Sequence, residues 1–480
     1  MTATPFQKAR YQITGVPRYR GIPFIEALPR YPKSKMKLLT CTAKYPPRPT
    51  AAIRKSGEMV RAAELRNLAD LRIPLPEYHT SAITLTLAIR EPYVTHNPLN
   101  VADVRRRHEV ATATDEQSQL VALQLAKSNA MGHLIISHTG GGKSTFLDGF
   151  LETYPQVIQH VSYHGRALIC TQIPYLILRC PHDGSLKALC LQFFYEIDLR
   201  LGTEYLKQAI AIRNIAPMVM LMKHVAVAVS LALLAIDELQ NLRVAAGAGA
   251  ELMLALFSDI LERVGVSLVV LATPAIHDVL GPNVRNVRKL TTVGDNVVEP
   301  LGPNDKRWIV YSDVYWGYSY TKKHGRLTSS IRRAWYNASG ANRGFAAAVY
   351  FLAQLDAIGG RECVDELSFE HVSKTRMAFL QPAISALVSG DPDQQLRFDD
   401  LVLQEPYANL RALVNQPDPP VIDFPDQEFD DEATARPQRK KVPTAAKNVA
   451  SKRASRREPA TPRSAHPRSV VLPRKSPPIR

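Results

Sequence analysis

The sequence has few cysteines and no long apolar run, and each absence excludes a class of protein. No two cysteines stand in a CxxC pair or at a zinc-ligand spacing, so we expect free thiols in a reducing compartment at Cys41, Cys170, Cys180, Cys190 and Cys363. The longest uncharged apolar stretch, Val225 to Ile236, has 12 residues and is too short to span a membrane. Residues 1–10 contain no apolar core of the kind found in a secretory signal. We therefore expect a cytoplasmic protein that does not enter a membrane.

Acidic residues are almost absent from the two ends of the chain. Residues 1–55 carry 12 Lys and Arg against Glu26 alone, and residues 435–480 carry 14 against Glu458 alone. The ends therefore hold charges of +11 and +13, and because the whole chain has +16, residues 56–434 hold −8. The C-terminal segment is also rich in Pro, Ser and Ala, a composition that cannot bury enough surface to fold alone. We expect a basic N-terminal arm over 1–55 and a disordered basic tail over 435–480.

Basic residues are in turn absent from the segment before this tail. Asp418 to Glu432 holds seven acidic residues, which indicates an acidic linker over 403–434 that either solubilises the chain or folds back on the tail and competes with a polyanion. In the N-terminal arm, four tyrosines alternate with basic residues and prolines: Tyr11, Tyr19, Tyr31 and Tyr45. That mixture is typical of a phosphate-binding arm with stacking side chains, or of an arm that docks on a protein partner.

A glycine-rich loop lies in the central segment, where residues 137–145 read Ser-His-Thr-Gly-Gly-Gly-Lys-Ser-Thr after an apolar run. Small residues let backbone N–H groups turn onto phosphate oxygens, a Lys neutralises the β/γ charge, and a hydroxyl holds Mg²⁺. The residues that we expect to bind ATP are His138, Thr139, Gly140, Gly141, Gly142, Lys143, Ser144 and Thr145. Ser137 occupies the first glycine position of the GxxxxGK[ST] pattern, which weakens the match without breaking it. Such a string also occurs in flexible surface loops, but the strand-like run before it and the amphipathic stretch Thr145 to Glu152 after it argue against that reading.

A second apolar run ends in two carboxylates. Leu231 to Ile236 is followed by Asp237 and Glu238, and Asp237 lies 94 positions beyond Lys143. A buried strand delivers such carboxylates to its C-terminal end, where the ligands of open α/β sheets bind. We expect Asp237, together with Ser144, to hold Mg²⁺, and Glu238 to orient and deprotonate the attacking water. The expected cofactors are therefore ATP and Mg²⁺.

Strands alternate with helices through the central segment, which predicts a right-handed parallel sheet. Besides the strand before the glycine loop, the predicted strands cover residues 173–178, 231–237 and 266–271. The predicted helices cover residues 57–71, 114–130, 186–199 (with Ser185 or Asp183 as N-cap), 251–264, 304–318, 326–337, 341–355 and 364–384. The pattern predicts an α/β core over 56–300 and a small helical lid over 301–402.

Two further polar residues stand at the ends of predicted elements. Thr273 follows the strand at 266–271 and is placed like the sensor 1 residue of AAA+ ATPases, which contacts the γ-phosphate or the attacking water. Arg343 opens a predicted lid helix, where AAA+ lids place an arginine that reaches the γ-phosphate. For one arginine at the start of a helix, a solvated surface position is the simpler alternative.

Several passages besides the glycine loop resemble the TnsC-type AAA+ transposition regulators, which are related to the TniB group of transposon ATPases. They are Tyr19–Pro29, Tyr93–Pro98, Leu178–Lys187, Phe193–Tyr205, Ile236–Gln240, Ala272–Pro274 and Ser339–Gly344. Pro-His-Asp-Gly-Ser-Leu-Lys over 181–187 and Leu-Gly-Thr-Glu-Tyr over 201–205 are more diagnostic than the ATPase motifs, which many families share. His96 stands where the resemblance predicts an arginine.

This resemblance implies an AAA+ P-loop ATPase that assembles on target double-stranded DNA as an ATP-bound homo-oligomer. The assembly would be a ring or a filament with a hexamer or heptamer per turn, and it would recruit or activate a transposase. Transposase subunits and a target-selector protein of the TniQ type are the implied partners. The resemblance also implies that Tyr93 lies near the adenine and that a trans-acting arginine follows Thr273. Arg285 and Arg288 are the candidates for that arginine, and a DNA or surface contact explains them equally simply.

The leading hypothesis is an ATP-switched, DNA-bound oligomer that hydrolysis through Glu238 dissolves. Basic ends on both sides of an ATPase favour nucleic acid as the partner. The alternatives are an AAA+ replication initiator or helicase loader, and an ATP-binding DNA scaffold with negligible turnover.

Overall fold

The computed structural model describes residues 6–32, 34–245, 248–280 and 284–391, together with residues 394 and 398. The segments predicted as an acidic linker (403–434) and a basic tail (435–480) lie outside the described residues. Within the described ranges, every helix is too short or too polar to traverse a lipid bilayer.

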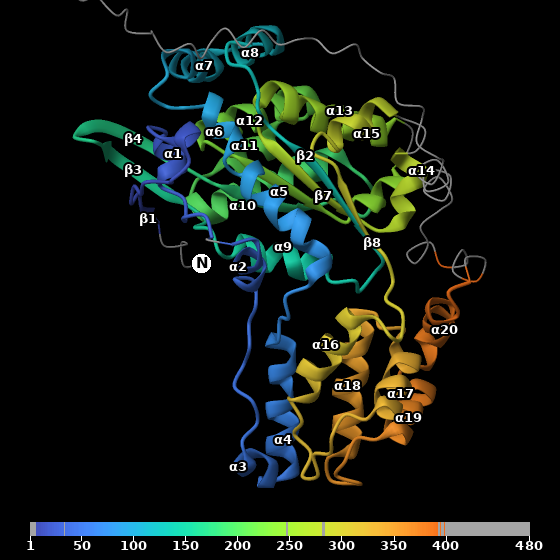
Figure 1. The fold of residues 1–480 in the computed structure, drawn as a ribbon. Helices are drawn as coiled ribbons and strands as arrows, with labels where there is room; N and C mark the ends of the chain where they lie inside the picture. Colours follow the sequence, from blue (N-terminus) through green and yellow to red (C-terminus); the bar gives the residue numbers. More distant parts are fainter. Residues whose placement is uncertain are drawn as a thin grey trace, which may run out of the picture. The chain divides into compact units, whose positions relative to one another are not determined.

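A parallel sheet of five strands lies at the centre of the described chain (Figure 1). Across the sheet the strands follow the order β5 (Tyr175–Arg179), β6 (Leu233–Asp237), β7 (Ser267–Ala272), β2 (Gly132–Ser137) and β8 (Asp295–Val298). Most of these residues are Leu, Ile, Val or Ala, which suit strands that are buried on both faces. Ile136 pairs with Ala272 and Ile236 pairs with Val270, so β7 separates the strand that leads into the glycine loop from the strand that ends in carboxylates. The predicted α/β class with a parallel sheet is confirmed.

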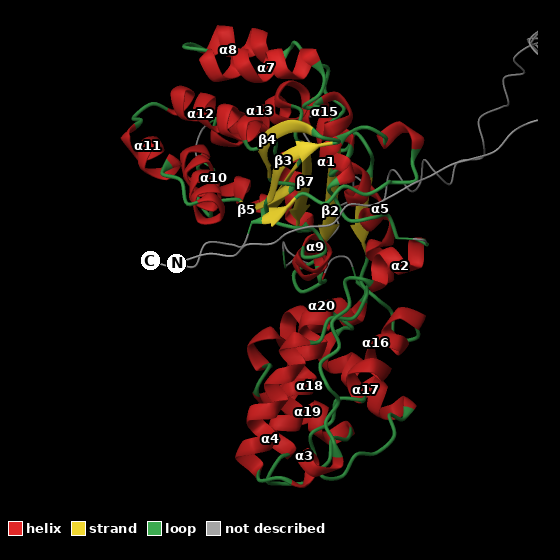
Figure 2. Ribbon diagram, turned by 90° about the vertical axis from the view of Figure 1, so that its left-hand side faces the viewer, coloured by secondary structure: helices red, strands yellow, loops and turns green. Residues whose placement is uncertain are grey.

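Helices cover both faces of this sheet (Figure 2). Successive residues of one strand point to opposite faces, so Ile135 belongs to one hydrophobic core and Leu134 and Ile136 to the other. The first core receives α5 (His79–Ala88) and α9 (Lys143–Leu151). The second core receives α10 (Leu186–Leu201), α12 (Ile215–Ala228) and α13 (Gly249–Asp259). Ser185 caps α10 as predicted, because its hydroxyl accepts a hydrogen bond from the Ala188 N–H at 3.3 Å.

A β-hairpin that we did not predict forms a second, smaller sheet. Its strands are β3 (Ile158–Tyr163) and β4 (Arg166–Gln172), and β1 (Gln7–Lys8) pairs with β3 in parallel. His164 and Gly165 connect the two strands with φ angles of 46° and 79°. Two consecutive residues with positive φ are typical of the tight turn that joins a two-stranded hairpin.

The predicted N-terminal arm packs against the rest of the described chain up to α2 (Lys35–Thr40), and its apolar residues are buried around α1 (Pro23–Glu26). Tyr19 is 3% exposed, and its hydroxyl donates to Glu91 Oε1 at 2.7 Å. This tyrosine is therefore part of the core and cannot stack on a nucleic-acid base. Tyr45, in contrast, is 55% exposed.

The helices that follow the sheet form a bundle, called the lid below. They are α16 (Lys306–Trp316), α17 (Ser329–Ser339), α18 (Arg343–Ala357), α19 (Glu366–Thr375) and α20 (Gln381–Ser389). The helix predicted over 364–384 is broken, since α19 ends at Thr375 and a 3-10 turn (Ala378–Leu380) precedes α20. Trp335 stacks between Tyr350 and Phe369 at the centre of the bundle.

Two helices from the N-terminal part of the chain, α3 (Ala51–Lys55) and α4 (Glu58–Glu64), also pack on the lid. The buried guanidinium of Arg61 donates to both carboxylate oxygens of Glu362, at 2.6 and 2.8 Å. The helix predicted over 57–71 is present, and its second half is a 3-10 helix (Leu65–Asp70). The chain thus contributes to the lid before it enters the sheet.

The remaining helices are α6 (Glu91–Thr95), α7 (Val101–Thr112), α8 (Glu116–Leu123), α11 (Tyr205–Ala211), α14 (His277–Leu280) and α15 (Val284–Leu290). The helix predicted over 114–130 ends at Leu123, and the helix predicted over 251–264 ends as a π-helical turn (Ile260–Val264). The turn-like passage at 91–98 begins with the short helix α6.

Candidate functional site

The glycine loop connects β2 to α9 and turns on two left-handed glycines. Gly140 and Gly142 have φ angles of 78° and 90°, a region in which residues with a side chain are strained. A Cβ atom on Gly140 would also lie 2.4 Å from Asn342 Oδ1. Between them, the N–H of Gly141 donates to His138 O at 3.0 Å, and its carbonyl accepts from the Tyr78 hydroxyl at 3.0 Å. Hydrogen bonds within the chain therefore hold the loop on both sides of the Gly141 peptide.

Ser137, the exception to the motif, lies directly beneath this loop. The residue is completely buried at the end of β2. A Cβ atom on Gly141 would lie 2.0 Å from Ser137 Oγ, which is closer than any two such atoms approach. The serine is accommodated because Gly141 has no side chain.

Lys143 and Ser144 begin α9, and Ser144 contacts the carboxylate at the end of β6. The Ser144 hydroxyl donates to Asp237 Oδ2 at 2.7 Å, and the other oxygen of Asp237 accepts the Glu238 N–H at 2.9 Å. A hydroxyl and a carboxylate in direct contact are the ligand pair that a P-loop enzyme offers to Mg²⁺. Among the described residues no group of three or more His, Cys, Asp or Glu side chains is arranged to hold a metal ion. The pair therefore suits a cation whose other ligands come from phosphate oxygens and water.

Glu238 is joined to Thr273 through a residue that the sequence analysis missed. Gln240 donates from Nε2 to Glu238 Oε2, and its Oε1 accepts the Thr273 N–H at 3.1 Å. Glu238 itself has a left-handed φ of 60°, a strained conformation for a residue with a side chain. The two expected catalytic residues at the ends of β6 and β7 are thus brought together by one amide. The sequence signals for Gln240 were its place two residues after Glu238 and its position at the end of the passage Ile236–Gln240, which carries the resemblance.

The lid reaches the glycine loop through the start of α18. Asn342 Nδ2 donates to Thr139 O at 2.7 Å, and the Gly344 N–H donates to Gly140 O at 2.9 Å. Asn342 Oδ1 also caps α18 by accepting the Phe345 N–H at 3.1 Å. A single asparagine therefore both starts the lid helix and holds the loop.

Arg343, between these two contacts, is held by an acidic partner. Its Nη2 donates to Glu77 Oε1 at 2.9 Å, and the guanidinium lies 4.5 Å from the centre of the Tyr311 ring. The side chains of Arg343 and Glu77 are only 8% and 5% exposed. Within the described part of the chain, Arg343 Nη1 and Glu77 Oε2 have no hydrogen-bond partner. The pair is therefore buried and incompletely satisfied.

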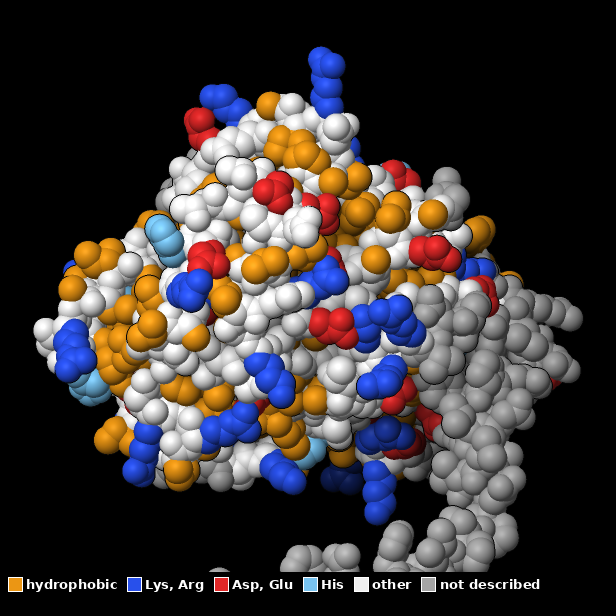
Figure 3. Space-filling view, turned by 90° about the horizontal axis from the view of Figure 1, so that it is seen from above, with side chains coloured by type: hydrophobic (Ala, Val, Ile, Leu, Met, Phe, Trp, Pro, Cys, Tyr) orange, Lys and Arg blue, Asp and Glu red, His pale blue; other side chains and the backbone are white. Residues whose placement is uncertain are grey.

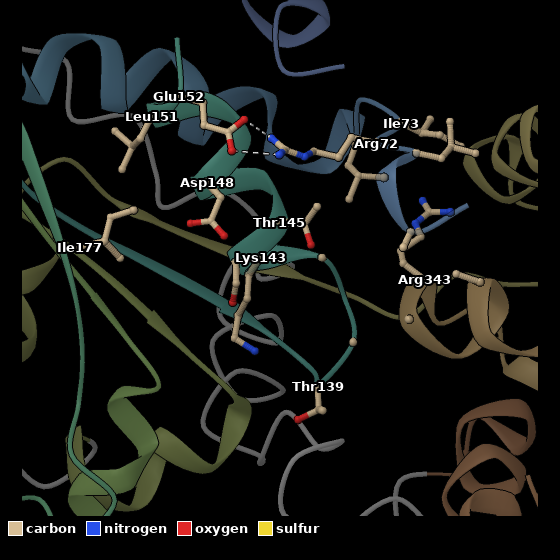
Figure 4. Close-up of a pocket in the computed structure, with 18 of the residues that line it drawn as sticks. Arg72, Ile73, Thr139, Lys143, Thr145, Asp148, Leu151, Glu152, Ile177 and Arg343 are labelled. Atoms are coloured by element: carbon tan, nitrogen blue, oxygen red, sulfur yellow. Dashed lines mark hydrogen bonds and ion pairs between the residues drawn. The ribbon is translucent and has the colours of Figure 1, made fainter. Parts of the chain in front are cut away.

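A cavity of about 970 Å³ joins these parts (Figure 4). The loop and α9 contribute Thr139, Gly140, Gly142, Lys143, Ser144, Thr145 and Asp148. Glu238 and Gln240 line it from the end of β6, and Arg343 and Gly344 line it from the lid. Apolar side chains from the segment before α5 and from the lid complete it, namely Leu71, Ile73, Leu75, Tyr311, Tyr315 and Ala347. Arg72 crosses its rim to form a two-bond ion pair with Glu152, at 2.7 and 3.0 Å.

Several predicted site residues lie elsewhere. Tyr93 does not line this cavity, and it is 1% exposed with its hydroxyl bonded to Ser230 O at 2.8 Å. Its ring packs against Phe24, 5.2 Å between centroids, so it is a core residue here. Arg285 and Arg288 are exposed on α15 and also do not line the cavity. Within the described residues, neither arginine is therefore part of the cavity at the glycine loop.

Electrostatics distinguish the basic residues of the site. Burial, together with the charges of Lys143 and Arg343, lowers the pKa of His138 to about 4, so its imidazole is neutral at pH 7. Burial and the carboxylates of Asp237 and Glu152 raise the pKa of Asp148. Lys143 and Arg343, rather than His138, are therefore among the cationic side chains that this cavity can offer to a polyphosphate.

Comparison with known proteins agrees with this arrangement of residues. Residues 127–280 match the family model described as an AAA domain. The matched segment begins before β2 and ends with α14. No curated protein matches the chain. The chain therefore contains an AAA-type P-loop ATPase domain.

The matching solved structures have low sequence identity to this chain. One is a Walker-type ATPase of Pyrococcus abyssi, with 13% identity and a TM-score of 0.35, covering 61% of this chain and 78% of that one. Another is the Aeropyrum pernix ORC1 protein in complex with DNA, with 13% identity and a TM-score of 0.36, covering 62% and 71%. A third is the Aeropyrum pernix ORC2 protein in ADPNP-ADP complexes, with 12% identity and a TM-score of 0.36, covering 65% and 71%.

Proposed function

We propose that this chain is an ATP-dependent, DNA-binding regulator of DNA transposition of the TnsC type. In this proposal it assembles on target DNA as an ATP-bound oligomer, recruits or activates a transposase, and leaves the DNA when ATP is hydrolysed. The observation that supports the ATPase part of this proposal is the 2.7 Å contact between Ser144 and Asp237 beside the glycine loop. The transposition half is supported by the resemblance in sequence.

Different residues at the cavity would perform different steps of ATP binding and hydrolysis. Backbone N–H groups of the loop would bind the phosphates, and Lys143 would neutralise their charge. Ser144 and Asp237 would hold Mg²⁺, which draws negative charge from the phosphate oxygens. Glu238 would accept a proton from the attacking water, and the amide of Gln240 would keep the carboxylate in place. The apolar side chains near Ile73, Leu75 and Tyr311 would receive the base in place of Tyr93.

The oligomer would complete the site from a neighbouring subunit. Arg285 and Arg288 are three residues apart on α15, so they share one exposed face of that helix. An arginine supplied in trans is worth roughly 10³–10⁵ in turnover, which would make hydrolysis depend on assembly. The basic tail over 435–480 would add phosphate contacts to DNA, and the transposase and a TniQ-type selector would bind the assembled form.

The first test is Glu238→Gln with duplex DNA present. The carboxylate would lose its ability to accept a proton while the amide still fills the position, so we expect turnover to fall by at least roughly 100-fold with nucleotide affinity nearly unchanged. Electron microscopy with ATP should then show assemblies that persist on the DNA. Unchanged turnover and disassembly would show that Glu238 is not the base.

The second test is Lys143→Ala, which removes nucleotide binding where Glu238→Gln removes only hydrolysis. This variant should fail to assemble on DNA with ATP, and normal assemblies would contradict an ATP switch.

Steady-state hydrolysis with and without duplex DNA distinguishes the switch from a scaffold with negligible turnover. Strand-transfer assays with a purified transposase test the transposition role, and stimulation of helicase loading instead would favour a replication factor.

A further inference from the structure

Two basic segments that are far apart in the sequence meet on the lid. One consists of residues 45–55, which include α3, and the other is the connection between α16 and α17 over 317–328 (Figure 1). Arg54 Nε donates to Ser319 O at 3.0 Å, and the Tyr318 hydroxyl donates to Pro46 O at 2.9 Å. The Arg48 guanidinium lies 5.9 Å from the centre of the Tyr318 ring. These contacts join the two segments into one surface.

The backbone of the second segment is held firmly while its side chains face solvent. Trp316 Nε1 donates to Gly325 O at 2.8 Å, and the Lys323 N–H donates to Glu362 O at 2.9 Å. The side chains of Lys323 and Arg326 are exposed. The basic residues of the combined surface, called the lid patch below, are Arg48, Arg54, Lys55, Lys322, Lys323 and Arg326.

The carboxylates near the lid patch do not cancel its charge. Glu362 is bound to the buried guanidinium of Arg61, and its second contact, with Lys322 at 3.5 Å, is longer. Glu58 follows α3, and the charge of Glu64 acts on Tyr320, so six basic side chains face three carboxylates. Burial and the charge of Arg54 lower the pKa of His324, so the lysines and arginines carry the charge at pH 7. On the face of the molecule in Figure 3, in contrast, basic side chains lie scattered among acidic and hydrophobic ones.

We propose that the lid patch binds the phosphate backbone of duplex DNA. Flexible lysines and arginines on a fixed loop offer charge without a preorganised hydrogen-bond pattern for base edges, so the contact would be independent of sequence. Tyr45, 55% exposed beside Tyr318, adds an aromatic side chain at the edge of the patch. This inference rests on the proposed DNA-binding function and assigns part of it to the lid.

The test compares the full chain with Lys323→Ala/Arg326→Ala by fluorescence anisotropy on a duplex of mixed sequence, with a slowly hydrolysed ATP analogue, over a range of salt concentrations. Each phosphate contact contributes about 0.9 to the slope of log affinity against log salt. We expect the slope of the double variant to be smaller by roughly two, with affinity at least several-fold weaker at low salt.

The matched control is Lys127→Ala/Lys207→Ala, which removes two exposed charges from the core domain. If this control weakens DNA binding as much as the lid variant, the effect comes from net charge and the lid patch is not a site. Unchanged affinity and slope in a folded lid variant would also overturn the inference. If the unaltered chain does not bind duplex DNA at all, it is the proposed function that fails.

Discussion

At the scale of single residues, the glycine loop is shaped by the side chain beneath it. Ser137 is buried and Gly141 lies against it, so the two positions constrain one another. Gly141 does not have a positive φ, and its lack of a side chain is therefore a matter of space rather than of backbone conformation.

Gly141→Ala tests this steric contact. Overpacking of this kind costs about 1–3 kcal/mol, which corresponds to roughly 5–150-fold if it appears entirely in nucleotide binding. We expect the affinity for a fluorescent ATP analogue to fall within that range. In the double variant Ser137→Gly/Gly141→Ala the closest clash is removed and part of the affinity should return. A double variant no better than Gly141→Ala would show that Ser137 does not set the shape of the loop.

Arg343 is a second residue whose behaviour depends on one neighbour. If this arginine moves to the γ-phosphate, it must leave Glu77, so the ion pair opposes ATP binding and has no effect on ADP. Glu77→Gln keeps a hydrogen-bond acceptor but removes the charge, and we expect ATP affinity to rise by about threefold to tenfold with ADP affinity constant. Isothermal titration with both nucleotides measures the difference.

Arg343→Ala in the same background is the control, because it should abolish the effect of Glu77→Gln. A loss of ATP affinity in Glu77→Gln would indicate the opposite arrangement, in which Glu77 orients Arg343 toward the phosphate.

At the scale of elements, four of the five strands described in the central sheet follow directly from the sequence pattern, and β8 was not predicted. Apolar runs of five or six residues separated by helical segments predicted β2, β5, β6 and β7 nearly at their bounds. The hairpin β3–β4 was missed because its residues alternate irregularly and only one face is buried. The last lid helix was predicted as one piece although Pro382 lies just beyond its break at residues 376–380. A proline is tolerated only in the first turn of a helix, so Pro382 marks the start of α20.

An ion pair between Arg61 of α4 and Glu362 of the lid attaches α4 to the lid. Arg61 and Glu362 are 301 positions apart, and Arg61 is completely buried. Glu362→Gln leaves a buried guanidinium without its counter-charge, which costs about 3–5 kcal/mol. Chemical denaturation should show this loss. Asp70→Asn, which breaks the exposed Lys44–Asp70 pair, should cost about 1 kcal/mol or less. Equal effects in the two variants would contradict the role of the buried pair.

At the scale of the whole molecule, two buried histidines make stability depend on pH. Burial and the charge of Arg106 lower the pKa of His96 to about 3, while the pKa of His138 is about 4. Below pH 6.5 the unfolded chain binds protons at both positions and the folded chain does not, so the free energy of unfolding falls as pH falls. The slope is at most about 1.4 kcal/mol per pH unit for each histidine, and it ends below pH 4 for His138 and below pH 3 for His96.

Denaturation series between pH 4 and 7 measure this slope. We expect His138→Asn to make it shallower, whereas the exposed residue His182 changed in the same way should leave it as it was. A slope unaffected by His138→Asn would show that other groups cause the acid sensitivity. Glu362 also lowers the free energy of unfolding as pH falls, but at lower pH. The hydrogen bonds from Arg61 lower the pKa of Glu362 to about 2, and the ion pair is lost when this carboxylate is protonated.

The sequence by itself determined the α/β class, the glycine loop and the carboxylates at the end of β6. These features are local, since small residues, a lysine and a hydroxyl must follow one another for the backbone to wrap a phosphate. Only the tertiary structure decided that Gln240 joins Glu238 to Thr273, that Glu77 holds Arg343, that Tyr93 lies in the core, and that α3 meets the connection after α16. The reason is physical: each of these relations is set by burial and by charge between side chains that the folded chain brings together, and no spacing along the sequence records them.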